Sequence, residues 1–534
     1  MRAADALVRA IVGTGTRHVF TLSGNQIMSL FDAAIDAPLE LIHVRHEAPA
    51  VHAADAIGRL SGRPGVAMVT AGPGFANTLS ALYVAQCAES PLVLLSGASP
   101  AGNPGAGAFQ EMDQAGLAAK VCKASWTCTA PERIAGDFAR AWRCAASGRP
   151  GPVHVALPVD VLESVIRDRE PAVELDEAAE APAPEDLAAV CQAIRDAARP
   201  LVIAGPPYRR RHAAESIRLL RDAGAAAVAM DSPRGLRDPA LGAFAEAVAE
   251  ADLVVLLGKR LDHMLELGAL PPFAPGCRFM QIDPEREALH QGAGNAGERM
   301  LLQAQGDPAG WAAALAERLA GCSLDAGWRS AVDAAVACRP SEWRNIGPDS
   351  PVHPARLGYA VDEFLARSSE SVLVSDGGEI GQWAQACANA PHRIINGPAG
   401  AIGSALPFAL AARTLFPQAR IAATLGDGTF GFHPLEIDTA VRHDLPFVAV
   451  VGNDARWNAE VQIQHRTYGA DRAAGCELRA TRYDEVVRAL DAHGAAVDSA
   501  AELPAALEAA HASGTAACVN VSLQPVAAPV ITRS

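Results

Sequence analysis

The chain has 534 residues, with 45 Lys and Arg against 60 Asp and Glu and a formal net charge of −15. This length allows about three or four domains, each able to bury its own core, and excludes a single small binding module. Charges of both signs are interspersed without the basic patch that nucleic acid needs, and no apolar run reaches the roughly 18 to 20 residues that cross a bilayer. We therefore expect a soluble protein that binds neither nucleic acid nor membrane.

The start of the chain and its cysteines predict a cytoplasmic protein. Met1 to Val12 carries Asp5 among alternating charged and apolar residues. It lacks the apolar core and cleavage site of a secretory signal, which predicts a first helix instead. The 11 cysteines form no CxxC pair, and their odd number cannot be fully paired within one chain. Buried, reduced cysteines are expected, not a disulfide scaffold or a zinc site.

Short β-branched and aliphatic runs alternate with Ala-rich helical patterns in three blocks, which is typical of βαβ units and parallel sheets. We predict an α/β protein with three doubly wound parallel-sheet domains in series, at residues 1–166, 185–322 and 350–525. A linker is expected over 167–184 and a less regular stretch over 323–351. The expected strands are 18–22, 39–44, 66–70, 92–96, 153–157, 201–204, 225–230, 253–257, 279–282, 372–375, 421–425, 447–451 and 517–523.

The third block holds two polar segments that directly follow neighbouring strands: Gly426-Asp427-Gly428-Thr429, and Asn453-Asp454. Both are expected at the carboxyl ends of parallel strands, the edge where open α/β sheets bind ligands. Magnesium takes oxygen ligands, usually one or two carboxylates with phosphate and water. Asp427, Asp454 and the backbone carbonyl of Arg456 can supply them. Taken alone, each segment is better explained by an ordinary turn or a helix cap.

The interval between the two segments is more specific, since Asp427 and Asp454 are 27 residues apart. Here the sequence resembles the thiamine diphosphate enzymes of the acetolactate synthase, benzaldehyde lyase and pyruvate decarboxylase superfamily, whose signature is a GDG segment followed at this interval by a paired-asparagine end. The resemblance covers nearly the whole third block. It includes Pro351-Val352-His353-Pro354, Asp376-Gly377-Gly378 with Trp383, Gly400-Ala401-Ile402-Gly403, Leu406-Pro407 and Tyr483-Asp484.

The first block supports the same family. Arg45-His46-Glu47 resembles the segment that carries the activating glutamate, and Thr70-Ala71-Gly72-Pro73-Gly74 with Asn77 continues the match. The resemblance implies that Glu47 shares a proton with the aminopyrimidine ring of thiamine diphosphate, so that the exocyclic nitrogen can remove the thiazolium C2 proton. Taken alone, Glu47 would more often be a solvated carboxylate at a helix start.

The resemblance also implies how the cofactor is held. Magnesium bound by Asp427, Asp454 and Arg456 anchors the diphosphate, and Gly428 and Thr429 donate backbone hydrogen bonds to it. Ile402 wedges the two rings into a V, and the Gly400 carbonyl accepts from the exocyclic amine; without the resemblance, Ile402 would be plain core. The full set expected at the cofactor is Glu47, Gly72, Asn77, Gly378, Gly400, Ile402, Gly426, Asp427, Gly428, Thr429, Asp454, Arg456 and Trp457.

Residues from three segments are expected at the substrate. Gln110 resembles the glutamine of acetolactate synthases and benzaldehyde lyase and can hydrogen-bond a substrate oxygen, unless it is a solvated loop residue. Glu460 lies where pyruvate decarboxylases carry a carboxylate beside the reacting carbon, and it is either a proton-transfer group or a surface acid. With Glu47, these two are the catalytic candidates. The expected substrate pocket is Asn25, Gln26, Phe109, Gln110, Trp457, Asn458 and Glu460.

Two departures from the family pattern stand out. Asp454 replaces the usual Asn, which adds a negative charge that favours the metal and weakens attraction for the diphosphate. The central block resembles a domain that holds FAD or an adenine nucleotide in some members, but its segment 233–251 is shorter than in flavin-binding acetolactate synthases. FAD is therefore not expected.

The resemblance implies a lyase or carboligase that acts on 2-oxo acids, acyloins or aldehydes, as acetolactate synthase or benzaldehyde lyase does. A 2-oxo acid decarboxylase and a 2-hydroxyacyl-CoA lyase are alternatives, although the short, uncharged segment 525–530 offers little to cover CoA. A paralogue that binds the cofactor without turnover is an alternative of another class. In the family the glutamate of one chain faces the diphosphate of another, so we expect at least a homodimer and commonly a homotetramer.

Overall fold

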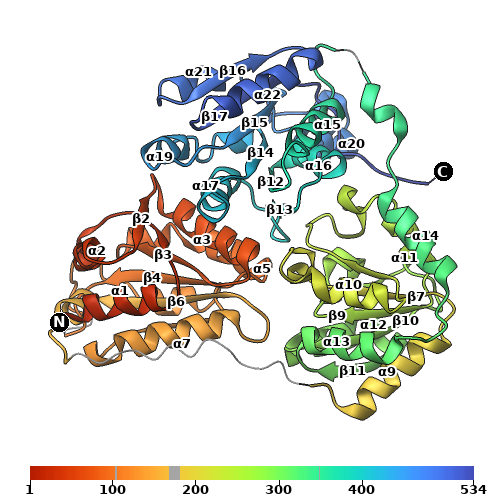
Figure 1. Ribbon diagram of the computed structural model, residues 1–534, viewed down its shortest axis with the longest axis horizontal. Helices are drawn as coiled ribbons and strands as arrows, with labels where there is room; N and C mark the ends of the chain where they lie inside the picture. The colour runs from red at the N-terminus through yellow and green to blue at the C-terminus, as the bar shows by residue number, and fades with distance from the viewer. Residues whose placement is uncertain (103–104, 168–180, 348, 534) are drawn as a thin grey trace.

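The computed structural model describes residues 1–102, 105–167, 181–347 and 349–533. Its strands form three parallel sheets that follow one another along the chain (Figure 1), which confirms the predicted α/β architecture. In each sheet the first strand lies next to an edge strand, and the chain then builds the sheet on both sides of it, as doubly wound folds do. Within the described residues, no helix combines the length and apolar character that a membrane span needs.

The first sheet has the order β2-β1-β3-β4-β6-β5. Two apolar cores cover its faces, one beneath α1 and α7 and one beneath α3 and α5. The strands are β1 (His18–Thr21), β2 (Glu40–His43), β3 (Gly65–Val69), β4 (Leu92–Ala98), β5 (Ala124–Thr127) and β6 (Pro152–Pro158), and the helices are α1 (Ala3–Gly13), α2 (Met28–Ile35), α3 (Glu47–Ser61), α4 (Pro73–Ala76), α5 (Leu79–Cys87), α6 (Gln114–Ala118), α7 (Ile134–Ala146) and α8 (Val159–Glu163).

The second sheet has the order β11-β10-β9-β7-β8. The strands are β7 (Pro200–Ala204), β8 (Ala227–Ala229), β9 (Leu253–Leu257), β10 (Arg278–Asp283) and β11 (Met300–Gln305), and the helices are α9 (Pro184–Asp196), α10 (Ala214–Asp222), α11 (Phe244–Glu250), α12 (Arg286–Ala296), α13 (Pro308–Leu319) and α14 (Ala326–Ala337). Helix α14 corrects the expectation of a less regular stretch over 323–351, because its apolar face packs into the core of this domain. Most of the expected linker, residues 168–180, lies outside the described residues.

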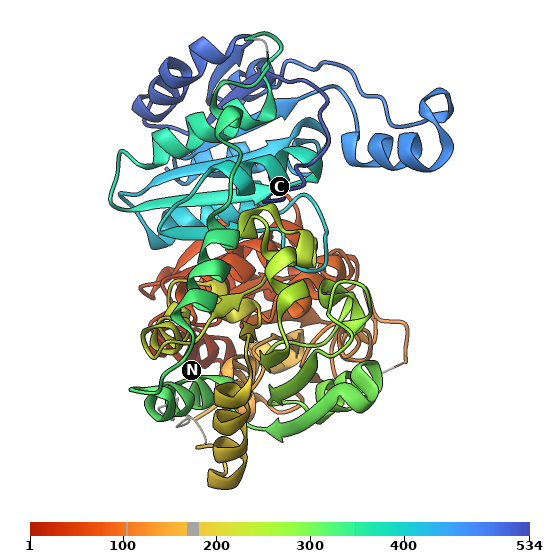
Figure 2. The same ribbon diagram turned by 90° about the vertical axis from the view of Figure 1, so that its right-hand side faces the viewer.

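The third sheet has the order β13-β12-β14-β15-β17-β16. The strands are β12 (Ser371–Asp376), β13 (His392–Ile395), β14 (Arg420–Gly426), β15 (Val448–Asn453), β16 (His493–Val497) and β17 (Ala517–Ser522), and the helices are α15 (Pro354–Leu365), α16 (Gly378–Cys387), α17 (Ala405–Leu415), α18 (Asp427–Phe430), α19 (Glu436–Arg442), α20 (Asn458–Tyr468), α21 (Tyr483–Arg488) and α22 (Leu503–Ala512). Figure 2 shows α20 projecting to one side of the body.

Four strands were not predicted: β5, β11, β13 and β16. Each lies at the edge of its sheet. An edge strand has one neighbour and is partly exposed, so it lacks the continuous apolar run that marks a strand buried on both faces. The run Met300–Gln305, for example, has a single fully buried residue, Ala304.

Helices α3 and α17 join the first and third domains. They contribute to one continuous buried cluster that contains Ala50, Ala53 and Ala54 of α3 with Ala405 and Ala409 of α17. Small side chains let the two helix backbones approach closely. The contact places the start of α3 beside the third domain (Figure 1).

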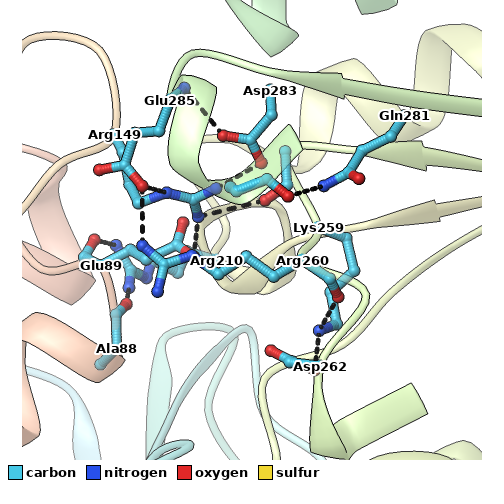
Figure 3. A network of polar contacts seen from close by, with 12 residues as sticks. Ala88, Glu89, Arg149, Arg210, Lys259, Arg260, Asp262, Gln281, Asp283 and Glu285 are labelled. Carbon is cyan, nitrogen blue, oxygen red and sulfur yellow. Dashed lines mark hydrogen bonds and ion pairs between the residues drawn. The ribbon is translucent and has the colours of Figure 1, made fainter. Parts of the chain in front are cut away.

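A buried ion cluster joins the first domain to the second (Figure 3). Arg149 donates to Asp283 Oδ2 at 2.5 Å and to Glu285 Oε2 at 2.9 Å, and it also pairs with Glu89. Arg260 shares Glu285 at 2.7 Å. Asp283 is the last residue of β10, so Arg149 from the first domain reaches the carboxyl edge of the central sheet.

His154 of β6 is a buried, neutral imidazole. Its Nε2 lies 2.7 Å from Ser96 Oγ and its Nδ1 lies 2.8 Å from Ser125 Oγ. Burial lowers the pKa of His154 to about 3. Because the imidazole keeps its ordinary pKa near 6.5 in the unfolded chain, the unfolded state binds more protons between these two values.

Replacing Arg149 by Met should lower the free energy of unfolding by about 3 to 5 kcal/mol, because it leaves Asp283 and Glu89 buried without a counter-charge. Urea denaturation followed by circular dichroism measures this loss. Arg218→Met is the matched control, since Arg218 forms its ion pairs with Glu215 and Asp222 on the exposed surface of α10. An equal loss in both variants would contradict the assigned role of the cluster.

His154 should make the folded state sensitive to acid. Its contribution to stability is present above pH 6.5 and is lost as the pH falls toward 3, by up to about 1.4 kcal/mol per pH unit. We expect the stability gap between wild type and His154→Gln to narrow between pH 6.5 and pH 5, in urea titrations at each pH. The exposed His290, replaced by Gln, serves as the control. A gap that stays constant over this range would contradict the assignment.

Candidate active site

A pocket lies at the carboxyl edge of the third sheet, where segments that follow three of its strands converge. These segments follow β12, β14 and β15, and Ile402 adds a further wall. The lining residues are Gly378, Glu379, Ile380, Ile402, Gly426, Asp427, Gly428, Thr429, Gly452, Asp454, Arg456, Trp457, Asn458, Ala459 and Glu460. The tertiary structure therefore brings together most of the C-terminal residues that the sequence predicts at the cofactor and the substrate.

Asp427 and Asp454 form the acidic end of this pocket. Burial raises the pKa of Asp427 to about 6, against the opposing effect of neighbouring backbone amides such as that of Gly428. Burial, and then the charge of Asp427, raise the pKa of Asp454 to about 7. Two buried carboxyl groups with raised pKa values are stabilised in their charged form by a cation between them.

The donor set fits a magnesium ion. Asp427 Oδ2 is buried and has no hydrogen-bond partner among the described residues, which leaves a carboxylate oxygen free for a metal. Asp454 supplies a second carboxylate, and Arg456 lines the same pocket. Magnesium usually takes only one or two carboxylates and completes its shell with phosphate and water. The described residues hold no group of three or more His, Cys, Asp or Glu placed to bind a metal.

Glycines allow close packing beside the pocket. A Cβ atom at Gly428 would lie 2.7 Å from the ring of Trp457, and one at Gly377 would lie 2.1 Å from Thr429 Oγ1. Any larger residue at these positions would have to push the neighbouring side chain away. The glycines therefore let Trp457 and Thr429 pack directly against the backbone, and Gly428 still lines the pocket.

Asp376 holds the loop that carries Ile402. Its Oδ2 accepts backbone hydrogen bonds from Gly403, Ser404 and Ala405 at 3.0, 2.7 and 2.9 Å. Burial raises the pKa of Asp376 to about 6, although these donors oppose the rise. We did not assign Asp376 a role from the sequence. Asp376 directly follows the predicted strand 372–375, and this position could have identified it as a candidate site residue.

Glu379 is a second pocket residue that sequence reasoning missed. It is buried, and its Oε2 accepts from Arg234 of the central domain at 3.1 Å. Burial raises its pKa, Arg234 opposes the rise, and Glu460 adds to it. Its partner lies 145 residues away, so no local pattern marks it. Glu460 itself is exposed at the mouth of the pocket, whereas Asn458 is buried and donates to the Val526 carbonyl at 3.1 Å.

Glu47 is the first residue of α3 and is only 8% exposed. Its Oε2 accepts a hydrogen bond from Asn77 Nδ2 at 2.9 Å. A Cβ atom at Gly74 would lie 3.3 Å from Glu47 Oε1, so the glycine leaves room for the carboxylate. Glu47 and Asn77, both predicted at the cofactor, are thus in direct contact.

The other N-terminal candidates gather around Gly72. Gln114, which the sequence analysis missed, accepts from the Gly72 amide at 2.9 Å and donates to Ser96 Oγ at 2.6 Å. A Cβ atom at Gly72 would lie 2.9 Å from that of Gln110. Gln26 is buried and accepts from Thr70 Oγ1 at 2.6 Å.

Some candidates are exposed. Asn25 and Gly400 are exposed, Phe109 is 71% exposed, and Gly378 is exposed while it lines the pocket. Among the described residues, the C-terminal pocket is lined by none of the N-terminal candidates. Within one chain, the Glu47 group and the Asp427 group thus form two separate surfaces.

Comparison with known proteins finds matches to all three domains. Models of thiamine pyrophosphate enzymes match three parts of the chain: the N-terminal TPP binding domain at residues 1–117, the central domain at 187–296 and the C-terminal TPP binding domain at 376–521. The chain is 34% identical to the acetolactate synthase large subunit of Mycobacterium tuberculosis, over 98% of this chain and 96% of that protein. It is 30% identical to human 2-hydroxyacyl-CoA lyase 2, over 90% of this chain and 82% of that protein. The chain belongs to the thiamine pyrophosphate enzyme family.

Proposed function

We propose that the protein is a thiamine diphosphate- and magnesium-dependent C–C bond lyase or carboligase that acts on 2-oxo acids, acyloins or aldehydes. The observation that carries this proposal is the buried, unpartnered Asp427 Oδ2 beside Asp454, in a pocket that Gly378, Gly426 and Gly428 also line. A buried carboxylate pair is costly in free energy unless a cation compensates it. An ordinary turn and a helix cap would not bury two acids together.

Bound thiamine diphosphate would supply the carbanion chemistry that breaks or forms the C–C bond. Asp427, Asp454 and the Arg456 carbonyl hold the magnesium ion that anchors the diphosphate. The Gly428 and Thr429 amides donate to the diphosphate, while Gly378, Gly426 and Trp457 shape its cradle. Ile402, held by the loop that Asp376 fixes, sets the angle between the cofactor's rings, and the Gly400 carbonyl accepts from its amine.

Glu47 holds a proton at the aminopyrimidine ring nitrogen. Its burial supports this role, because a dry site keeps water from competing for the proton. Asn77 keeps the Glu47 carboxylate in place through its 2.9 Å hydrogen bond. Gly72, held by Gln114, brings the Gln110 side chain to the same region.

Substrate contacts come from both domains. We propose Gln110 and Glu460 as the groups that bind or transfer a proton at the substrate oxygen. Glu460 at the mouth of the pocket is suited to this, because it reaches solvent on one side and the pocket on the other. Asn25, Gln26, Phe109, Trp457 and Asn458 complete the proposed substrate pocket.

The proposed site needs two chains. The Glu47 group and the Asp427 group form separate surfaces within one protomer, so we propose a homodimer in which each chain completes the other's site, commonly paired into a homotetramer. Exposed apolar side chains on the projecting helix α20, Ile463 and Tyr468, are consistent with a further contact there.

We place the enzyme in the cytoplasm and propose domain limits of 1–166, 185–322 and 350–525.

The substrate class is supported by the relatives. The 34% identical mycobacterial acetolactate synthase, which aligns with this chain over almost its full length, supports an acetolactate synthase-like condensation. The second candidate, a 2-hydroxyacyl-CoA lyase, has the support of the 30% identical human protein. A screen of 2-oxo acids, aldehydes, acyloins and 2-hydroxyacyl-CoA esters, read by product mass, separates these candidates and a simple decarboxylase. We propose that the protein holds no FAD, and yellow absorbance of the purified protein would contradict this proposal.

Replacing Asp427 by Asn should weaken magnesium-dependent binding of thiamine diphosphate at least about 100-fold, because it removes the carboxylate oxygen that faces the metal. Isothermal titration calorimetry measures this. Asp454→Asn should weaken binding of Mn²⁺ alone but retain cofactor binding, since it removes one negative charge that faces the diphosphate. Exposed Asp471→Asn is the control. If titration of the wild-type protein with millimolar thiamine diphosphate and magnesium gives no measurable binding heat, the proposal is contradicted.

Replacing Glu47 by Gln should slow exchange of the cofactor's C2 proton with solvent deuterium by about 100- to 10,000-fold, because Gln cannot share the activating proton. Proton NMR of the bound cofactor measures the rate, and cofactor affinity should change little because the metal site is intact. The exposed Glu132, replaced by Gln, is the control. A wild-type protein that binds the cofactor without accelerating this exchange would instead favour the non-catalytic paralogue.

A further inference from the structure

Four residues before α3, His43 to His46, lie against α19 of the third domain. His43 N donates to His443 Nε2 at 3.1 Å, and Arg442 Nη2 donates back to the His43 carbonyl at 2.7 Å. The His46 ring lies 5.7 Å from the ring of His433. The turn that leads into Glu47 therefore makes hydrogen bonds and a ring contact with residues 433–443, which are far away in the sequence.

Glu436 makes the most buried of these contacts. It is 1% exposed, and its Oε1 accepts a hydrogen bond from the Arg45 backbone amide at 3.1 Å. Thr439 Oγ1 donates to Glu436 Oε2 at 2.7 Å and fixes the carboxylate in that orientation. The Arg45 side chain turns outward and pairs with Asp438 at 3.1 Å. Glu436 thus binds the backbone, not the charge, of Arg45.

The position of Arg45 matters because it lies two residues before Glu47. His46, between them, is extended with φ −156° and ψ 154° and caps α3 by accepting from the Ala48 amide. Fixing the Arg45 amide therefore fixes where α3 begins and in which direction its first side chain leaves the backbone. A displacement of about 1 Å at such a point can cost about 100-fold in rate.

We propose that Glu436 is a positioning residue for Glu47, which it holds through the Arg45 amide. This inference rests on the proposed function, since it concerns the activating role of Glu47. Glu436 does not touch the cofactor site in this proposal. It binds the backbone amide of the turn, across the interface between the first and third domains.

The link has a consequence for the assembled enzyme. Glu436 follows Asp427 by nine residues, so α18 of the metal site and α19 are consecutive parts of one segment. In the proposed dimer, Glu47 serves the partner's cofactor while its own third domain holds it in place. Each chain's diphosphate domain then positions the acid that activates the other site.

The test compares two substitutions at one position. Glu436→Gln keeps an acceptor oxygen for the Arg45 amide, whereas Glu436→Ala removes it. We expect Glu436→Ala to slow C2 proton exchange of bound thiamine diphosphate by about 10- to 100-fold. Its affinity for the magnesium-bound cofactor should change less than about threefold. Glu436→Gln should restore the exchange rate to within about threefold of wild type, and the exposed Glu485, replaced by Ala, is the control.

Each outcome supports or overturns the positioning role of Glu436. Loss of exchange with unchanged cofactor affinity, rescued by Gln, supports the positioning role. Equal losses of exchange and affinity in the Ala variant, or exchange equal to wild type, would overturn it. If the Ala variant does not fold, Glu436→Gln and Glu436→Thr are compared instead, and equal exchange rates in the two would overturn it. A wild-type protein without cofactor binding or exchange refutes the proposed function itself, which separates the two failures.

Discussion

The contact between α3 and α17 is the constraint on which the rest of the arrangement depends. Alanines on both helices form a continuous buried cluster, and the same face carries a buried ion pair in which Arg59 donates to Asp55 at 2.5 Å. Arg59 also donates to the Ile395 carbonyl of the third domain at 2.6 Å. The ion pair lies within α3, whereas the Arg59–Ile395 hydrogen bond crosses the interface. This bond favours one relative placement of the two domains, because a shift would leave a buried guanidinium N–H without its acceptor. Since Glu47 is the first residue of α3, this packing also places the candidate activating acid.

The acidic end of the pocket follows a different principle. Burial raises the pKa values of Asp427 and Asp454, and the charge of Asp427 adds to the rise at Asp454, which makes the charged pair costly. Such a cost is typical of binding sites and would be recovered on binding the proposed cation and diphosphate. The surrounding structure supplies the rigidity. Asp376 accepts three backbone amides, and Trp457 lies against Gly428.

Sequence patterns predicted the central strands well and the edge strands poorly, because only strands buried on both faces are continuous apolar runs. The same distinction holds for the site. Asp427 and Asp454 could be found because they directly follow such strands. Gln114, Glu379 and Glu436 could not, because each is a polar residue at an ordinary helical position. Their partners, Gly72, Arg234 and the Arg45 amide, lie in other elements or other domains.

The sequence by itself determined the fold class, the order of the domains and the placement of acidic residues at strand ends, because these depend on local periodicity and on the geometry common to all parallel sheets. Only the tertiary structure decided which polar groups are buried together, as Arg149 is with Asp283, 134 residues away. It also decided that Glu47 and Asp427 lie on separate surfaces of one chain. Burial and pairing are properties of packed neighbours, and neighbours that are distant in sequence leave no local pattern.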